Sequence, residues 1–175
     1  ASATAEIIFE DCFVPDSARV GKEGRGFMIA MQTLQMSRPV VAAISVGIAQ
    51  AAIEAAVAYS HHRKQFGVKI ATFEMVQQMI ADMVMKTEAA RILTYKACVA
   101  QMNKDKKAGL YSAMSKCFAS DTAMEVTTTA VQVMGGNGYS RENPVEKYMR
   151  DAKIMQIYEG TNQVQRLVIA NEITF

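Results

Sequence analysis

Apolar and small residues recur at helical spacing over most of this 175-residue chain. The longest regular pattern begins at Val76 and continues in alternating steps of four and three residues. Its members are Val76, Ile80, Met83, Thr87, Ala90, Thr94 and Ala97. Such a stripe predicts a helix of roughly seven turns with one face buried in a bundle. We expect Thr72 to cap its N-terminus, because a threonine hydroxyl can accept a hydrogen bond from the first turn.

The segment before this helix is also patterned as helix. We expect a first helix over 27–35 and a second that begins near Pro39 and runs to about His62, since proline suits the first turn of a helix. The apolar stretch Val40–Tyr59 has about the length of a membrane span. Three polar residues interrupt it: Ser45, Gln50 and Glu54. We therefore interpret it as a bundle helix and expect no membrane span.

Glycine, proline and threonine mark the later helices. A helix over 109–134 should end at Gly135-Gly136, because glycine is favoured just beyond a helix C-terminus. In Asn143-Pro144-Val145-Glu146 the asparagine is a candidate N-cap and the proline a first helical residue. Thr161 should cap a last helix that runs to about Asn171.

Residues 5–14 differ, because they are rich in β-branched and aromatic side chains and stop at Pro15. This pattern predicts one strand. One strand cannot form a sheet, so we expect it to have lost its partners. The predicted fold is all-α: an up-down four-helix bundle with short extra C-terminal helices, preceded by one orphan β-strand.

Composition narrows the functional classes. The 19 basic and 17 acidic residues are well mixed and leave a net charge of +2, so we expect no nucleic acid partner. Three widely spaced cysteines lack the pairing of a metal site and indicate reduced thiols in a cytosolic or matrix-like compartment. Thirteen methionines are typical of an adaptable helical core, and they could equally form a soft wall around an acyl chain.

The segment Ile157-Tyr-Glu-Gly-Thr-Asn-Gln163 is the strongest candidate for chemistry. Glu159 lies between an apolar, aromatic run and a glycine. A carboxylate walled by apolar groups has a raised pKa, which would make it a general base near neutral pH. Gly160 removes side-chain bulk and would let a flat substrate approach. The alternative is a solvated glutamate at a turn before a helix.

Two further patterns are weak when taken alone. Gly135-Gly136-Asn137-Gly138 resembles a phosphate cradle but follows a helix, so a helix stop and a tight turn are the simpler interpretation. His61-His62 lies at a helix end without a third ligand, so we predict no metal site.

Together, four motifs resemble one family. In order they are Arg63-Lys-Gln-Phe-Gly67, Gln132-Val-Met-Gly-Gly-Asn-Gly-Tyr139, Tyr148-Met-Arg-Asp-Ala-Lys153 and Ile157-Tyr-Glu-Gly-Thr-Asn-Gln163. Their residues, order and separations resemble the C-terminal helical domain of the acyl-CoA dehydrogenases, closest to the short- and medium-chain, butyryl-CoA dehydrogenase-like branch. The likeness covers essentially the whole chain.

The resemblance implies a domain division and a context. Residues 1–25 would be a remnant of the family's middle β-domain, with its last strand and a crossover loop, and 26–175 the helical bundle. The chain would then be a fragment of a homotetrameric enzyme that passes electrons to an electron-transfer flavoprotein. Its compartment would be the cytoplasm if bacterial and the mitochondrial matrix if eukaryotic. Alone, the fragment is expected to be inactive and could be a non-catalytic oligomerisation module.

The resemblance also implies a reaction, the α,β-desaturation of an acyl-CoA thioester to trans-2-enoyl-CoA, as in fatty acid β-oxidation. Glu159 aligns with the base that removes the α-proton. Some branches place their base just before an arginine of the first long helix, where this chain has Ser37, so Glu159 is the sole candidate. The residues aligned with substrate contacts are Gln35, Met36, Ser37, Arg38 and Gly160.

Three segments align with contacts to the cofactor FAD. The first two reach the FAD of a neighbouring subunit, and the third begins the helix after the base. The aligned residues are Arg63, Lys64, Gln65, Phe66, Gln132, Val133, Met134, Gly135, Gly136, Thr161, Asn162 and Gln163. An acyl-CoA oxidase-like or reductase-like relative, with the same base and a different electron partner, is an alternative.

Overall fold

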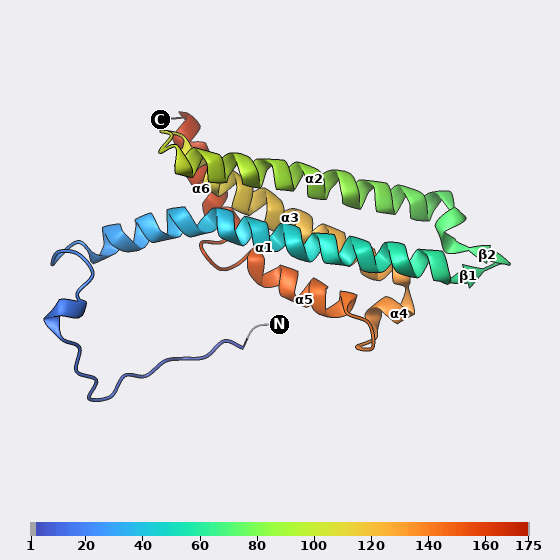
Figure 1. Ribbon diagram of the computed structural model, residues 1–175, viewed down its shortest axis with the longest axis horizontal. Coiled ribbons are helices and arrows are strands. Elements are labelled where there is room, and N and C mark those ends of the chain that lie inside the picture. The colour runs from blue at the N-terminus through green and yellow to red at the C-terminus, as the bar shows by residue number, and fades with distance from the viewer. Residues whose placement is uncertain (1–2, 175) are drawn as a thin grey trace.

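The computed structural model of the chain describes residues 3–174. Three long helices lie side by side and alternate in direction, and a shorter fourth one, α5, runs along α1 and α3 (Figure 1). The helices are α1 (Gly26–His62), α2 (Glu74–Met102), α3 (Ala108–Met134), α4 (Gly136–Tyr139), α5 (Val145–Met155) and α6 (Asn162–Thr174). This arrangement confirms the predicted all-α bundle, with α4 and α6 as its short extra helices.

Small residues let the helices approach closely. The core where α1, α2, α3 and α5 meet is rich in alanine and filled by a few larger side chains. Its buried members include Ala49, Ala52, Ala56, Met83, Ala123, Val126, Ala130 and Val145. Close-packed interiors of this kind leave little room for voids, which fixes how the helices sit against one another.

The predicted stripe of α2 is confirmed, but the predicted cap is wrong. Five stripe residues are buried, from Met83 to Ala97, and Val76 and Ile80 pack partly buried against the core. Thr72 instead closes a short 3₁₀ helix, η2 (Ile70–Thr72), where its hydroxyl donates to the Lys69 carbonyl at 2.8 Å. The helix therefore begins with Phe73 at its N-cap position and no side-chain cap.

The predicted break at Pro39 is also wrong, because α1 is one continuous helix through this residue. Proline lacks the N–H that would bond the carbonyl of Gln35. The side-chain amide of Gln101, from α2, donates to that carbonyl at 2.7 Å and replaces the missing bond.

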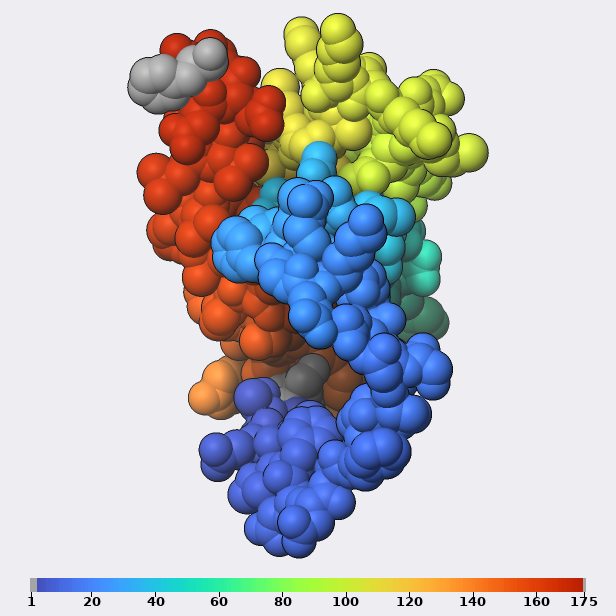
Figure 2. Space-filling view, turned by 90° about the vertical axis from the view of Figure 1, so that its left-hand side faces the viewer, coloured from blue at the N-terminus to red at the C-terminus, as the bar shows by residue number. Residues whose placement is uncertain are grey.

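The predicted strand over residues 5–14 is absent. This segment is exposed and carries no ladder hydrogen bonds, and Figures 1 and 2 show it apart from the helices, beneath the bundle. A strand needs a neighbouring strand for its backbone groups, and the described chain offers none there. A 3₁₀ turn, η1 (Asp16–Ala18), follows it.

Sheet structure within residues 3–174 is limited to a small hairpin after α1. Its antiparallel strands are β1 (Lys64–Gln65) and β2 (Val68–Lys69). Phe66 and Gly67 form the turn with φ of 51° and 83°, and Phe66 packs edge-on against Phe73. Positive φ at both central positions is typical of tight hairpin turns.

The other predicted boundaries agree closely with the structure. α3 ends at Met134, and Gly135 follows with a φ of 60°. α5 begins at Val145, although the Asn143 amide bonds the Asn137 carbonyl and makes no cap. Thr161 caps α6 as predicted, because its hydroxyl accepts from the Val164 N–H at 3.3 Å, but the helix continues to Thr174.

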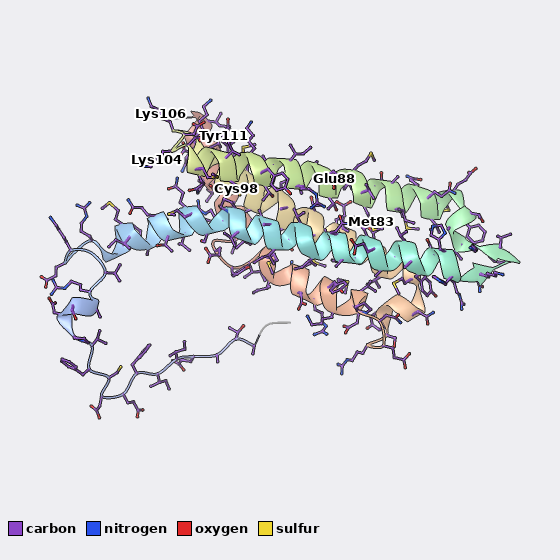
Figure 3. The ribbon with its side chains drawn as sticks, viewed as in Figure 1. Met83, Glu88, Cys98, Lys104, Lys106 and Tyr111 are labelled. Carbon is purple, nitrogen blue, oxygen red and sulfur yellow. The ribbon has the colours of Figure 1, made fainter. Side chains whose placement is uncertain are left out.

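Two surface features bear on the predicted partners. α1 is long and apolar enough to cross a membrane, with a mean hydropathy of 1.9, and 44% of that window is buried inside the described chain. Because α1 packs on α2, α3 and α5, we interpret it as a bundle helix. The basic run at 104–107 occupies the turn between α2 and α3 (Figure 3), which gives a local positive charge only.

Candidate functional site

The candidate base lies in the loop between α5 and α6, and this loop reaches the N-terminal third of α1. The Ser37 hydroxyl donates to the Glu159 carboxylate with an Oγ–Oε2 distance of 2.5 Å. These residues are 122 positions apart, so the contact joins the first helix to the last loop. Glu159 is half-buried.

The polypeptide takes an unusual conformation at this point. Glu159 has a φ of 57° and Gly160 a φ of 86°, so two consecutive residues are left-handed. For a residue with a side chain, this conformation costs about 1–3 kcal/mol and persists only where the surroundings enforce it. A Cβ at Gly160 would lie 2.6 Å from the Gln165 Nε2, so both the backbone and its close neighbour require glycine here.

Two buried side chains enforce the turn. Gln165, from α6, donates its amide to the carbonyls of Glu159 and Gly160 at 3.1 and 3.0 Å. Lys116, from α3, donates to the Gly160 carbonyl and to Asn162 Oδ1, both at 2.9 Å. The side chains of Lys116 and Gln165 are 0% exposed. Burial lowers the pKa of Lys116 to about 8, against the opposing charges of Asp121 and Glu159.

Asn162 anchors the loop from inside the protein. It is 3% exposed, and its amide donates to Ser120 Oγ and Asp121 Oδ1 at 2.8 and 2.7 Å. Its backbone N–H bonds the Gln156 carbonyl at 3.0 Å. The side-chain amide and the backbone N–H of Asn162 therefore both bond groups of this chain. This disfavours a contact between its side chain and a cofactor.

Asp121 extends this network toward the surface. It accepts hydrogen bonds from Gln156 at 2.6 Å and from Arg166 at 2.6 Å, besides that from Asn162. Burial alone would raise the pKa of Asp121, but these donors outweigh it and lower the pKa. With Thr161 and Gln163, these residues line a hollow of about 580 Å³ at the start of α6.

The groups beside Glu159 are more polar than the sequence suggested. Arg38 is 6% exposed, and its Nε atom has no partner among the described residues. Burial lowers the pKa of Arg38, and the charge of Glu159 partly offsets this. Ile157 is 49% exposed, so the apolar run does not enclose the carboxylate. Gln35 and Met36 are exposed on the same turn of α1.

A second candidate region lies at the other end of α5. A pocket of about 440 Å³ opens where α1, the hairpin and the end of α3 meet. Seven of the residues aligned with FAD contacts line it: Arg63, Gln65, Gln132, Val133, Met134, Gly135 and Gly136. Tyr59 and Asn137 add polar groups, and they bond each other at 2.6 Å. Lys64 and Phe66 lie outside the pocket, and Phe66 is 94% exposed.

The two regions are far apart in one chain. Ser37 lies beside Glu159, and His62 directly precedes the pocket residue Arg63. Ser37 and His62 are separated by 25 residues of α1, which span roughly 37 Å. Figure 1 likewise shows the hairpin at one end of the bundle and the α5–α6 loop well away from it, alongside α1.

Lys116 and Gln165 are the functional candidates that the sequence analysis missed. The signal for Lys116 is its position, because it falls on a face of α3 made of small residues. Its neighbours on that face are Ser112, Ala113, Ala119, Ser120 and Ala123, all buried. A charged residue in such a stripe needs buried partners.

Comparison with known proteins identifies the family to which this chain is similar. The family described as acyl-CoA dehydrogenase, C-terminal domain, matches residues 24–174. Probable acyl-CoA dehydrogenase FadE25 of Mycobacterium tuberculosis is 54% identical over 98% of this chain and 44% of its own length. The mitochondrial short-chain specific acyl-CoA dehydrogenase of Mus musculus is 46% identical over 99% of this chain and 42% of its own length.

A solved structure gives the same result. Butyryl-CoA dehydrogenase from Megasphaera elsdenii is 49% identical and superposes with a TM-score of 0.92, over 96% of this chain and 44% of that one. The chain therefore spans less than half the length of these relatives.

Proposed function

Because this chain belongs to the acyl-CoA dehydrogenase family through its C-terminal domain, we propose that the full-length protein desaturates acyl-CoA thioesters between their α and β carbons. In this proposal Glu159 is the base that removes the α-proton. The observation that carries it is the contact between Ser37 and Glu159, since it places one carboxylate, without a rival, against the turn of α1 aligned with the substrate.

The geometry suits proton abstraction. The Ser37 hydroxyl donates to the Glu159 carboxylate, which fixes the orientation of the proposed base. Arg38 holds a buried guanidinium with an unpartnered Nε, which can bind a polar group of the thioester or of coenzyme A. Gly160 has no side chain to block the approach to Glu159.

FAD, when bound, supplies the acceptor for the β-hydrogen as hydride. The pocket beside Arg63 suits part of this cofactor, because a guanidinium is a good ligand for pyrophosphate. A Cβ added at Gly135 or Gly136 would meet nothing within 4 Å, so a ligand can come close to the backbone there. At the other region, Thr161 and Gln163 open the N-terminus of α6, where helix N–H groups favour phosphate or hydroxyl oxygens.

One FAD molecule cannot bridge both regions of the same chain. Roughly 37 Å of helix lies between them, which exceeds the length of an extended dinucleotide. This separation supports a site shared between subunits, with Glu159 from one and the Arg63 segment from a neighbour. We propose a homo-oligomer, a tetramer in the full-length protein, with an electron-transfer flavoprotein as acceptor. The compartment would be bacterial cytoplasm or the mitochondrial matrix.

The base assignment is tested with Glu159→Gln in the full-length protein. We expect kcat to fall by about 100-fold or more, since a positioned general base contributes on that scale, while flavin stays bound. Glu88→Gln is the matched control, because Glu88 is an exposed glutamate of α2 that pairs with Arg91. Turnover of acyl-CoA by Glu159→Gln near the wild-type rate would remove Glu159 as the base.

A second function has its own supporting observation. Large apolar side chains are exposed on α2: Met75, Val84, Met85, Ile92, Val99 and Met102. Exposed apolar surface of this extent favours association, so the 175-residue chain by itself could be a helical association module. A visible absorption spectrum of the purified chain separates the two. A stoichiometric flavin band that bleaches with butyryl-CoA contradicts the module, and a colourless oligomer supports it.

A further inference from the structure

Lys116 is a buried basic group that the proposed reaction does not use. Its side chain is wholly buried. One of its two hydrogen bonds ends at Gly160, in the loop that carries Glu159, and the other at Asn162, the first residue of α6. A buried amine loses its hydration and is stable only where protein acceptors replace water. Here the acceptors are the Gly160 carbonyl and the Asn162 side chain, one residue and three residues after the candidate base.

We propose that Lys116 is a positioning residue for Glu159, acting through the Gly160 carbonyl to hold the left-handed turn that places the Glu159 carboxylate beside Ser37. The proposal rests on the function proposed above, and it adds a role for a residue outside the substrate and cofactor contacts.

The backbone conformation of Glu159 and Gly160 needs groups that hold it. The peptide that joins Glu159 to Gly160 lies between two left-handed residues, and a glutamate leaves that conformation readily if nothing holds it. A change of φ at Glu159 redirects its Cα–Cβ bond relative to the chain before it. The 2.5 Å contact with Ser37 tolerates little movement, so the turn must be held by groups outside it.

Gln165 is an independent second anchor of the same turn. Gln165 belongs to α6, which follows the loop, whereas Lys116 belongs to α3, which precedes it. The Gln165 amide donates to the carbonyls of both Glu159 and Gly160. The Gly160 carbonyl therefore accepts from two buried donors, Lys116 at 2.9 Å and Gln165 at 3.0 Å. Two rigid helices thus fix the Gly160–Thr161 peptide, and Gln165 also fixes the Glu159–Gly160 peptide before it. A precise catalytic geometry needs such an arrangement.

The experiment compares Lys116→Met with the wild type in the full-length, flavin-loaded protein. Methionine keeps the unbranched shape and removes the donor. We expect kcat per bound flavin to fall by about 10- to 100-fold, because a displacement of about 1 Å in a reacting group costs on that scale. The KM for acyl-CoA should change by less than about threefold, since substrate contacts remain. Exchange of the substrate α-hydrogen with D2O should fall in parallel with kcat.

A purely structural role gives a different result. It lowers the yield of flavin-loaded protein and the thermal midpoint, and leaves both kcat per flavin and α-hydrogen exchange unchanged. That result overturns the proposal. Lys86→Met is the matched control, because Lys86 is an exposed lysine of α2 paired with Glu125.

A second variant covers the case in which Lys116→Met does not fold. Gln165→Met removes the other anchor without changing a charge, and we expect the same selective loss of kcat. Normal kcat per flavin in Gln165→Met would overturn the proposal. Failure of the base assignment is distinguishable, because it would leave Glu159→Gln active. If Glu159→Gln is inactive and the anchor variants are fully active, only the positioning role is wrong.

Discussion

At the residue scale, the buried amine of Lys116 links stability to pH. Its pKa is lowered by burial to about 8 in the folded protein, from an ordinary value of 10.5. Between these values the unfolded chain binds more protons than the folded one. The free energy of unfolding therefore rises with pH in this window, by at most about 1.4 kcal/mol per pH unit. Neutral Lys116 still has two N–H groups for its two acceptors, so its hydrogen bonds persist.

We expect the thermal midpoint of the wild type, minus that of Lys116→Met, to increase as the pH rises from about 8 to about 10. The charged groups that act on Lys116 are Arg38 from α1, Asp121 and Cys117 from α3, and Glu159 from the loop. All of them are present in both proteins, so their own titration cancels to first order. Gln165→Met provides the control, because its difference from the wild type should not vary over this range. A constant difference for Lys116→Met would contradict the linkage.

At the element scale, the continuity of α1 depends on a contact with α2. Pro39 leaves the carbonyl of Gln35 without its helical donor, and Gln101 supplies one at 2.7 Å. We expect Gln101→Leu to cost about 1–3 kcal/mol, because an acceptor loses its partner. In a Pro39→Ala background the new N–H of residue 39 can bond Gln35, so the same substitution should cost at least about 1 kcal/mol less.

Thermal denaturation of the four proteins in this double-mutant cycle measures the coupling. Gln101 also donates to Ser112 at 2.8 Å, but that bond is lost in both backgrounds and cancels. Equal costs of Gln101→Leu in the two backgrounds would show that the Gln35 carbonyl does not depend on Gln101.

Local signals predicted the elements whose causes are local. The stripe of α2, the end of α3 at Gly135 and the cap by Thr161 follow from spacing and from single residues, and all three are confirmed. Residues 5–14 have strand propensity, but a strand requires a neighbour that no local pattern provides. The passage of α1 through Pro39 depends on Gln101, which is 66 residues from the Gln35 carbonyl that it bonds, so local patterning could not predict it.

The same distinction holds for the candidate site. Glu159 and the pocket residues near Arg63 were predictable from motifs and resemblance, because each motif is contiguous. The anchors Lys116 and Gln165 carry no motif, and their role depends on how α3 and α6 pack against the loop. The positive φ of Glu159 is likewise enforced by tertiary contacts, since glutamate has no intrinsic preference for it.

At the scale of the whole molecule, the separation of the two candidate regions has a functional consequence. The Arg63 pocket lies at one end of the bundle, and Glu159 lies roughly 37 Å from it along α1. If one active site needs both, two subunits must contribute to it. Each subunit would then donate its Glu159 region to one site and its Arg63 region to another, as closed symmetric oligomers allow.

This arrangement predicts complementation between two inactive variants. Consider a pair made of one Glu159→Gln subunit and one Arg63→Ala subunit. One of its two sites combines the intact Glu159 of the Arg63→Ala subunit with the intact Arg63 of the Glu159→Gln subunit. Random pairing should restore about a quarter of all sites, which is about half of the sites in the mixed pairs, whereas each variant alone stays inactive. Co-expression with two different tags, followed by purification through both, isolates the mixed oligomers for activity and flavin measurements. Mixed oligomers without activity would mean that each chain builds its own site, because no combination of these variants then contains both residues.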